Sequence, residues 1–139
     1  MQEYCRKPNE TAAVTTHDGY FRTGDVALMD VEGRFKIVDR IKDMILVSGF
    51  NVYPNEIEAV VANLDGVLEA ACIGIPDERT DEVVKLFVVK SPGKDISAED
   101  VITFCRDNLT AYKVPKQIAF INELPKSAVG KILRRELRD

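Results

Sequence analysis

The sequence of 139 residues predicts an α+β fold in which a small open sheet of about three strands is covered by helices on one face. Runs rich in β-branched residues alternate with two segments whose apolar residues recur at helical spacing. After residue 42 the expected order is strand, helix, strand, strand, helix, strand and helix. A β-hairpin is expected before this unit.

Residues 1–41 predict a separate and incomplete piece of β structure. A helical turn is expected over 9–14, and turn signals flank strands expected at 20–23, 26–30 and 34–39. So few strands with exposed edges do not make a stable fold alone. We therefore expect this segment to be disordered or to form a dimer by pairing with another copy of the chain.

The first half of the second unit begins with a short strand over 44–47, followed by a loop over 49–51. Pro54 suits the first turn of a helix, and Asp65-Gly66 ends it. The apolar residues of this helix follow the i, i+3, i+4, i+7 spacing and are Ile57, Val60, Val61 and Leu64.

The second half is expected to contain strands over 67–75 and 82–90, both rich in β-branched residues. Ser97 caps the next helix, with Asp100 three residues further on. A strand over 117–122 and a short basic helix from residue 132 complete the expected elements.

The composition is that of a soluble globular protein, with 45% apolar and 30% charged residues. The net charge of −4 argues against nucleic acid as a partner. The C-terminal end is locally basic, with a charge of +3, and this predicts a small phosphorylated ligand. Its basic residues are Lys126, Lys131, Arg134, Arg135 and Arg138.

The three cysteines show no metal or redox spacing. Cys72 lies in an apolar run and Cys105 on an expected apolar helix face, so both are predicted to be buried free thiols. Free thiols indicate a reducing, cytoplasmic setting. No metal cluster and no membrane-spanning run is expected, although peripheral contact with the inner membrane stays an alternative.

Two short motifs allow a structural and a functional interpretation. Thr23-Gly24-Asp25 is an ordinary turn sequence, but an ionised Asp25 is also suited to accept two hydrogen bonds from a ribose diol. Arg40 is either a solvated cation or a donor to the same sugar. Lys42 and Asp43 form a charged pair at the expected boundary between the two units. Lys42 is therefore either an ordinary surface residue or part of a pivot between the units.

Gly49 and Lys131 leave similar alternatives. Gly49 is a turn glycine, or it leaves room for a narrow ligand to pass close to the backbone. Lys131 is a surface lysine, or a mobile cation delivered to an anion by a flexible four-carbon side chain.

Four ordered motifs together closely resemble the C-terminal end of the adenylate-forming superfamily, which includes acyl-CoA synthetases, luciferases and peptide-synthetase adenylation domains. The motifs occupy residues 20–25, 38–43, 48–58 and 124–135. Residues 47–54 and 125–127 most resemble the bacterial long-chain fatty acid–CoA ligases.

The resemblance implies a reaction in which ATP activates a fatty acid to an acyl-adenylate, which CoA then converts to a thioester. Asp25 and Arg40 would bind the nucleotide, Lys42 would be the hinge, Gly49 would line the pantetheine tunnel, and Lys131 would be the catalytic lysine of adenylation only. The substrates would be ATP, yielding AMP, a fatty acid and CoA.

The resemblance also implies a division of the chain. Residues 1–41 would be the end of a large N-terminal adenylation domain, and residues 42–139 a mobile lid. The phosphate loop, acyl pocket and Mg site would lie in that N-terminal domain, so the chain alone is expected to be inactive. Alternatives are the lid of an aryl-acid or peptide-synthetase adenylation enzyme, or a non-catalytic α+β interaction module.

Overall fold

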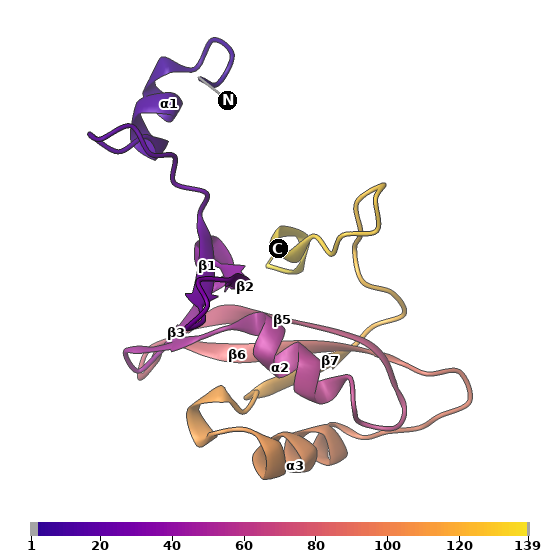
Figure 1. Ribbon diagram of the computed structural model, residues 1–139. Helices are drawn as coiled ribbons and strands as arrows, with labels where there is room; N and C mark the ends of the chain where they lie inside the picture. Colours follow the sequence, from indigo (N-terminus) through magenta and orange to yellow (C-terminus); the bar gives the residue numbers. More distant parts are fainter. Residues whose placement is uncertain (1–2, 139) are drawn as a thin grey trace. The chain divides into compact units, whose positions relative to one another are not determined.

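The computed structural model describes residues 3–138 and divides them into two compact units, one ending at Lys42 and the other beginning at Asp43 (Figure 1). The short 3-10 turn η1 (Ile41–Asp43) spans the boundary. Each unit has its own secondary structure and is described separately.

The first unit contains one helix and one hairpin. Helix α1 (Pro8–Val14) starts with a proline, whose missing N–H costs nothing at that position. Strands β1 (Asp25–Met29) and β2 (Phe35–Arg40) pair antiparallel, with Asp25 opposite Arg40 and a bulge between Val26 and Ala27.

The strand expected over 20–23 is wrong. Phe21 makes only an isolated antiparallel bridge with Thr15, at the end of α1. Thr16 and Gly19 close a tight turn between these two positions, so too few residues face each other to extend the bridge into a ladder.

The second unit is built on one mixed sheet in the order β4-β3-β6-β5, with β7 also pairing with β6. Its strands are β3 (Ile45–Val47), β4 (Phe50–Val52), β5 (Val67–Asp77), β6 (Asp81–Lys90) and β7 (Gln117–Phe120). Strand β7 runs parallel to β6, whereas the other pairs are antiparallel. The α+β class is confirmed, but the sheet has five strands rather than about three.

Helices α2 (Pro54–Val61) and α3 (Ala98–Asn108) cover one face of this sheet, as expected. Ser97 and Asp100 form the reciprocal capping box that starts α3. Alternate residues of β6 point to this face because side chains of a strand alternate between its two sides. The core on this side includes Ile57, Val61, Val84, Leu86, Val101 and Cys105.

The opposite face of the sheet is covered by the C-terminal segment. Leu124 and Leu137 pack there against Ile73, Phe87 and Val89. Figure 1 shows α3 on one side of the sheet and the yellow C-terminal segment on the other. The short 3-10 turn η2 (Ala111–Lys113) lies between α3 and β7.

The short basic helix expected from residue 132 begins later, at residue 134, and is only a 3-10 turn. Ile132 forms a bridge with Lys126, and the Leu133 N–H donates to the Pro125 carbonyl, so the chain remains extended to this point. Only the 3-10 turn η3 (Arg134–Leu137) follows. No helix among residues 3–138 combines the length and apolar character needed to cross a membrane.

Candidate functional site

The first unit brings two predicted site residues together. Asp25 and Arg40 face each other across β1 and β2, with the Arg40 Nε 3.5 Å from the Asp25 Oδ1. The Ile41 N–H donates to the Gly24 carbonyl at 2.9 Å, which closes the end of the hairpin beside them. The Arg40 side chain is exposed and that of Asp25 half-buried, so this ion pair adds little to stability.

Lys42 and Asp43 lie on either side of the boundary between the units. Both belong to the 3-10 turn η1, and Lys42 is exposed. The Asp43 carboxylate belongs to the second unit and pairs there with the Arg134 guanidinium group at 3.6 Å. Lys42 is thus the last residue of the first unit, and its role as a hinge stays a prediction.

Gly49 lies in the two-residue turn that joins β3 to β4. Ser48 and Gly49 have φ angles of +50° and +81°, and Val47 pairs with Phe50 across the turn. Positive φ at both central residues is typical of a type I′ turn. The loop expected over 49–51 is thus a tight turn followed by a strand.

A side chain at Gly49 would meet no atom within 4 Å. The backbone conformation alone explains why glycine suits the turn, and the space above it is open to a ligand. The structural and functional interpretations of Gly49 are therefore compatible.

A stacked aromatic pair beside this turn was not anticipated from the sequence. The rings of Phe50 and Tyr112 lie 4.7 Å apart at 19°. A hollow of about 260 Å³ adjoins them, and residues along its wall include Val47, Ser48 and Val84. The two aromatics are 62 positions apart in the printed sequence, and no local pattern links them.

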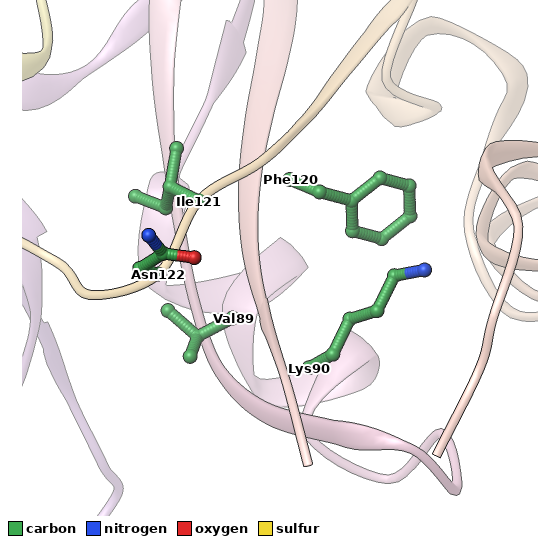
Figure 2. Close-up of a pocket in the computed structure, with 5 residues that line it drawn as sticks. All are labelled: Val89, Lys90, Phe120, Ile121 and Asn122. Atoms are coloured by element: carbon green, nitrogen blue, oxygen red, sulfur yellow. The ribbon is translucent and has the colours of Figure 1, made fainter. Parts of the chain in front are cut away.

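A second hollow, of about 230 Å³, lies between the ends of β6 and β7 and is shown in Figure 2. Its Lys90 lies over the Phe120 ring, 4.4 Å from the centroid, and forms an ion pair with Asp95 at 2.7 Å. Because its lysine is already paired and none of the predicted site residues lines it, this hollow is not assigned to the site.

Lys131 is carried by a short hairpin over residues 125–133, which we call the Lys131 hairpin. The Ser127 N–H donates to the Lys131 carbonyl at 2.8 Å, and the Lys131 N–H donates to the Ser127 Oγ at 3.2 Å. Gly130 has a φ of +78°, which lets the chain reverse. The Lys131 side chain is exposed and makes no ion pair with any residue that the structure describes.

Several cations of the basic C-terminal end, which is expected to bind a small phosphorylated ligand, form ion pairs within the chain. Lys126 pairs with Glu69, Arg134 with Glu58, and Arg135 with its neighbour Glu136. These cations are at least partly neutralised within the chain. Lys131 is thus distinguished from these three cations by its lack of an acidic partner among the described residues.

The Arg134 network was missed by the sequence analysis. The Arg134 side chain is only 13% exposed, and its Nη2 donates to the Glu58 Oε2 at 2.7 Å and to the Asn55 Oδ1 at 2.9 Å. Its Nη1 lies 3.6 Å from the Asp43 Oδ2. Glu58 is 76 residues away in sequence, so no local spacing could reveal the pair.

The thiol predictions for Cys72 and Cys105 are confirmed, because both are buried free cysteines, whereas Cys5 is exposed. Burial raises the pKa of the Cys105 thiol to about 11. No cluster of three or more His, Cys, Asp or Glu residues suited to a metal occurs within residues 3–138. No magnesium-dependent step is assigned to the described residues.

The fold and these motifs define a class of protein. The AMP-binding enzyme C-terminal domain family matches residues 56–131, which is more than half of the chain. The chain belongs to this family.

Curated relatives match over the whole chain. The chain is 59% identical to the long-chain-fatty-acid–CoA ligase of Salmonella typhimurium over 141 residues, covering 100% of this chain and 24% of that protein. It is 44% identical to a 3-[(3aS,4S,7aS)-7a-methyl-1,5-dioxo-octahydro-1H-inden-4-yl]propanoyl:CoA ligase of Rhodococcus jostii, again over 100% of this chain and 27% of the relative. The chain thus spans about a quarter of the length of these relatives.

Solved structures show the same fold. ATP-bound MatB from Rhodopseudomonas palustris matches with a TM-score of 0.94 and 36% identity, over 99% of this chain and 27% of that one. The expected membership of the adenylate-forming enzymes is confirmed.

Proposed function

We propose that this chain is the C-terminal part of an AMP-forming long-chain fatty acid–CoA ligase, with residues 42–139 acting as its mobile lid. The observation that carries the proposal is the 59% identity to a long-chain-fatty-acid–CoA ligase along the whole chain. The 44% identity to a ligase of a different acid is clearly lower, which favours the fatty-acid class over other carboxylates.

In the first step of the proposed reaction, a carboxylate oxygen of the fatty acid attacks the α-phosphorus of ATP. The bond from that phosphorus to the bridging oxygen breaks, and pyrophosphate leaves. In the second step, the CoA sulfur attacks the acyl carbon, the bond to AMP breaks, and the thiol proton is lost to solvent. Thioester and AMP are the products.

Lys131 would serve the first step. Its exposed ammonium group at the end of a flexible side chain can approach both the carboxylate and the α-phosphate, whose negative charges otherwise repel each other. A donor aimed at developing negative charge is commonly worth about 10²–10³ in rate. Because no described acidic residue pairs with Lys131, its charge is available for this purpose.

Asp25 and Arg40 would bind the ribose of the nucleotide. The Asp25 carboxylate would accept hydrogen bonds from the sugar hydroxyls, and Arg40, whose Nε lies 3.5 Å from the Asp25 Oδ1, would add a donor. Lys42 would be the hinge about which the lid rotates between the two steps. Gly49 would then line the path of the CoA pantetheine arm, since the space above its turn is open.

The remaining partners follow from the same proposal. Magnesium, the acyl pocket and the phosphate-binding loop would belong to an N-terminal adenylation domain of the full-length enzyme. The enzyme would act in the reducing cytoplasm, where buried thiols such as Cys105 stay reduced, with peripheral contact at the inner membrane.

Substrate profiling of the full-length protein tests the substrate class. Long-chain fatty acids should give ATP- and CoA-dependent thioester formation, whereas aryl acids and amino acids should be poor substrates. Preference for an aryl acid or an amino acid would instead support the other adenylate-forming classes.

The rival interpretation, a non-catalytic interaction module, requires a different test. A chimera in which this chain replaces the matching quarter of the Salmonella ligase keeps the upstream machinery constant, and we call it the chimera. Joint substitution of Asp25, Arg40 and Lys131 by Ala should abolish its turnover. Unchanged turnover would support the rival. The 139-residue chain alone should show no ATP–pyrophosphate exchange.

A further inference from the structure

The Lys131 hairpin is attached to the rest of the second unit on both of its strands. Just before it, Leu124 is buried against the sheet, and in its first strand the Lys126 Nζ forms an ion pair with the Glu69 carboxylate on β5. After it, Leu137 is buried on the same face. Between the hairpin and Leu137 lies Arg134.

Arg134 is the most enclosed cation in this arrangement. Its guanidinium group contacts three partners, namely Glu58 and Asn55 on helix α2 and Asp43 at the start of the unit. The contact with Glu58 is bidentate, because the Arg134 Nη2 donates to the Glu58 Oε2 at 2.7 Å and the Arg134 Nε donates to the Glu58 Oε1 at 3.3 Å. A planar fork of donors fixes direction as well as distance, which a lysine cannot do.

The Glu58 carboxylate, which accepts both of these hydrogen bonds from Arg134, is itself held in place. The Glu58 Oε1 also accepts the Cys72 N–H of strand β5 at 2.9 Å. Glu58 is only 14% exposed, so little water competes for its oxygens. Helix α2, strand β5 and the C-terminal segment therefore meet at a single carboxylate.

Inside the hairpin, by contrast, the backbone hydrogen bonds around Lys131 are few and local, although the neighbouring Ile132 packs against the core on this face of the sheet. Residues 127, 130 and 131 bond to one another, and the Lys131 backbone gains no described bond to the sheet or to α2. The direction in which Lys131 points thus depends on how the two strands of the hairpin are anchored. Arg134 follows the second strand directly, one residue after Leu133 bonds to Pro125.

We propose that Arg134 is a positioning residue for adenylation, which fixes the hairpin that carries Lys131 against helix α2 and Asp43. The proposal rests on the proposed function of Lys131. Arg134 does not touch the substrate in this account, because its guanidinium group is already occupied by Glu58, Asn55 and Asp43. Its effect reaches the reaction through the placement of Lys131.

The chimera provides the kinetic test. Arg134→Met should slow acyl-adenylate formation by about 10²-fold, the scale expected when a catalytic group is misplaced by about 1 Å. Thioester formation from supplied acyl-adenylate should stay within about twofold, because Lys131 is proposed to act in the first step only. Arg134→Lys should recover the adenylation rate only in part, since it restores the charge without the fork.

Arg135→Met is the matched control. Arg135 is the next residue, its side chain is 81% exposed, and it contacts only its neighbour Glu136 at 3.8 Å. This variant removes the same charge from the same turn, and both half-reactions should stay within about twofold of the unsubstituted chimera. An equal loss in Arg134→Met and Arg135→Met would overturn the proposal.

Amide hydrogen exchange on the 139-residue chain supplies a readout that does not depend on catalysis. Arg134→Met should speed exchange at residues 127, 130, 131 and 133 while leaving the β5–β6 ladder protected. Unchanged exchange in the hairpin, or a similar loss of both half-reactions with an intact ladder, would overturn the proposal. Loss of protection in the β5–β6 ladder would show that Arg134→Met affects folding in general. In that case Arg134→Lys is used instead, and the same comparison of hairpin exchange and of the two half-reactions supports or overturns the positioning role of Arg134.

Lys131→Ala separates the failure of this inference from failure of the proposed function. If Lys131→Ala spares adenylation, the role of Lys131 is wrong and the positioning role of Arg134 falls with it. If Lys131→Ala is selective for adenylation but Arg134→Met is not, only the role of Arg134 is wrong.

Discussion

Replacing Gly49 with alanine separates the structural role of this residue from its proposed role in the second half-reaction. The turn needs a positive φ of +81°, and the added methyl group would meet no atom of the chain within 4 Å. The change therefore adds backbone strain without a clash inside the second unit.

The size of the strain follows from the backbone angle. Placing an L-residue with a Cβ in the left-handed region costs roughly 1–2 kcal/mol. For a unit of this size, each kcal/mol lowers the melting temperature by about 4–8 °C. Gly49→Ala should thus unfold at a lower temperature but remain folded at 25 °C.

Gly93→Ala is the matched control for this strain. Gly93 has a φ of +72° and equally open surroundings in the same unit, but it lies in the turn after β6, away from the β3–β4 turn. Both variants should therefore lose similar stability, which thermal unfolding followed by circular dichroism measures.

The two variants should differ in the chimera. Gly49→Ala should slow thioester formation from supplied acyl-adenylate by on the order of 10²-fold, because the methyl group would obstruct the pantetheine arm. Adenylate formation should be almost unchanged in both variants. Equal thioester rates in Gly49→Ala and Gly93→Ala would refute the tunnel role and leave Gly49 as a turn glycine only.

Three further predictions follow from other parts of the chain. In the chimera, Asp25→Asn should raise the KM for ATP by about 10–100-fold, the loss expected when hydrogen bonds to a charged group are removed. The control Asp18→Asn should leave the KM unchanged. Equal KM values in the two variants would argue against ribose binding by Asp25. Burial raises the pKa of the Cys105 thiol from 9.0 to about 11, so the folded state disfavours the thiolate. The stability that the protonated thiol contributes is therefore complete below pH 9 and is lost as the pH rises to about 11. Urea unfolding across this range should be less pH-dependent in Cys105→Ala than in the parent chain, and identical slopes would contradict the assignment. The apolar side chains on the β1–β2 hairpin are 60–72% exposed at Leu28, Met29, Phe35 and Ile37, so sedimentation should show self-association that a chain starting at Asp43 lacks; a monomer at every concentration would contradict this.

The elements with strong local signals could be predicted from the sequence. The apolar spacing from Ile57 to Leu64 and the Ser97–Asp100 capping box each placed a helix where the structure has one. Both signals act within one or two helical turns, so a local pattern is sufficient to reveal them.

The errors arose where tertiary contacts outweighed local preference. Strand β4 has only three residues, and two of them, Phe50 and Asn51, fall in the loop expected over 49–51. The C-terminal helix is reduced to the 3-10 turn Arg134–Leu137, because Ile132 instead forms an isolated bridge with Lys126.

The candidate site shows the same division. Asp25, Arg40 and Lys131 could be proposed from ordered motifs, and the hairpin register explains why the first two meet. The Arg134–Glu58 pair could not be proposed, since its partners are 76 residues apart and each has an ordinary surface-residue identity. Such a pair is set by how the C-terminal segment folds over the sheet.

The ratio of the two half-reaction rates in the Lys131→Ala chimera tests the central claim most directly. ATP–pyrophosphate exchange measures acyl-adenylate formation, and CoA consumption with supplied acyl-adenylate measures thioester formation. We predict that the ratio falls by about 10²–10³ relative to the unsubstituted chimera, because Lys131 acts only while negative charge develops on the phosphate. An unchanged ratio would contradict the assignment of Lys131 to adenylation.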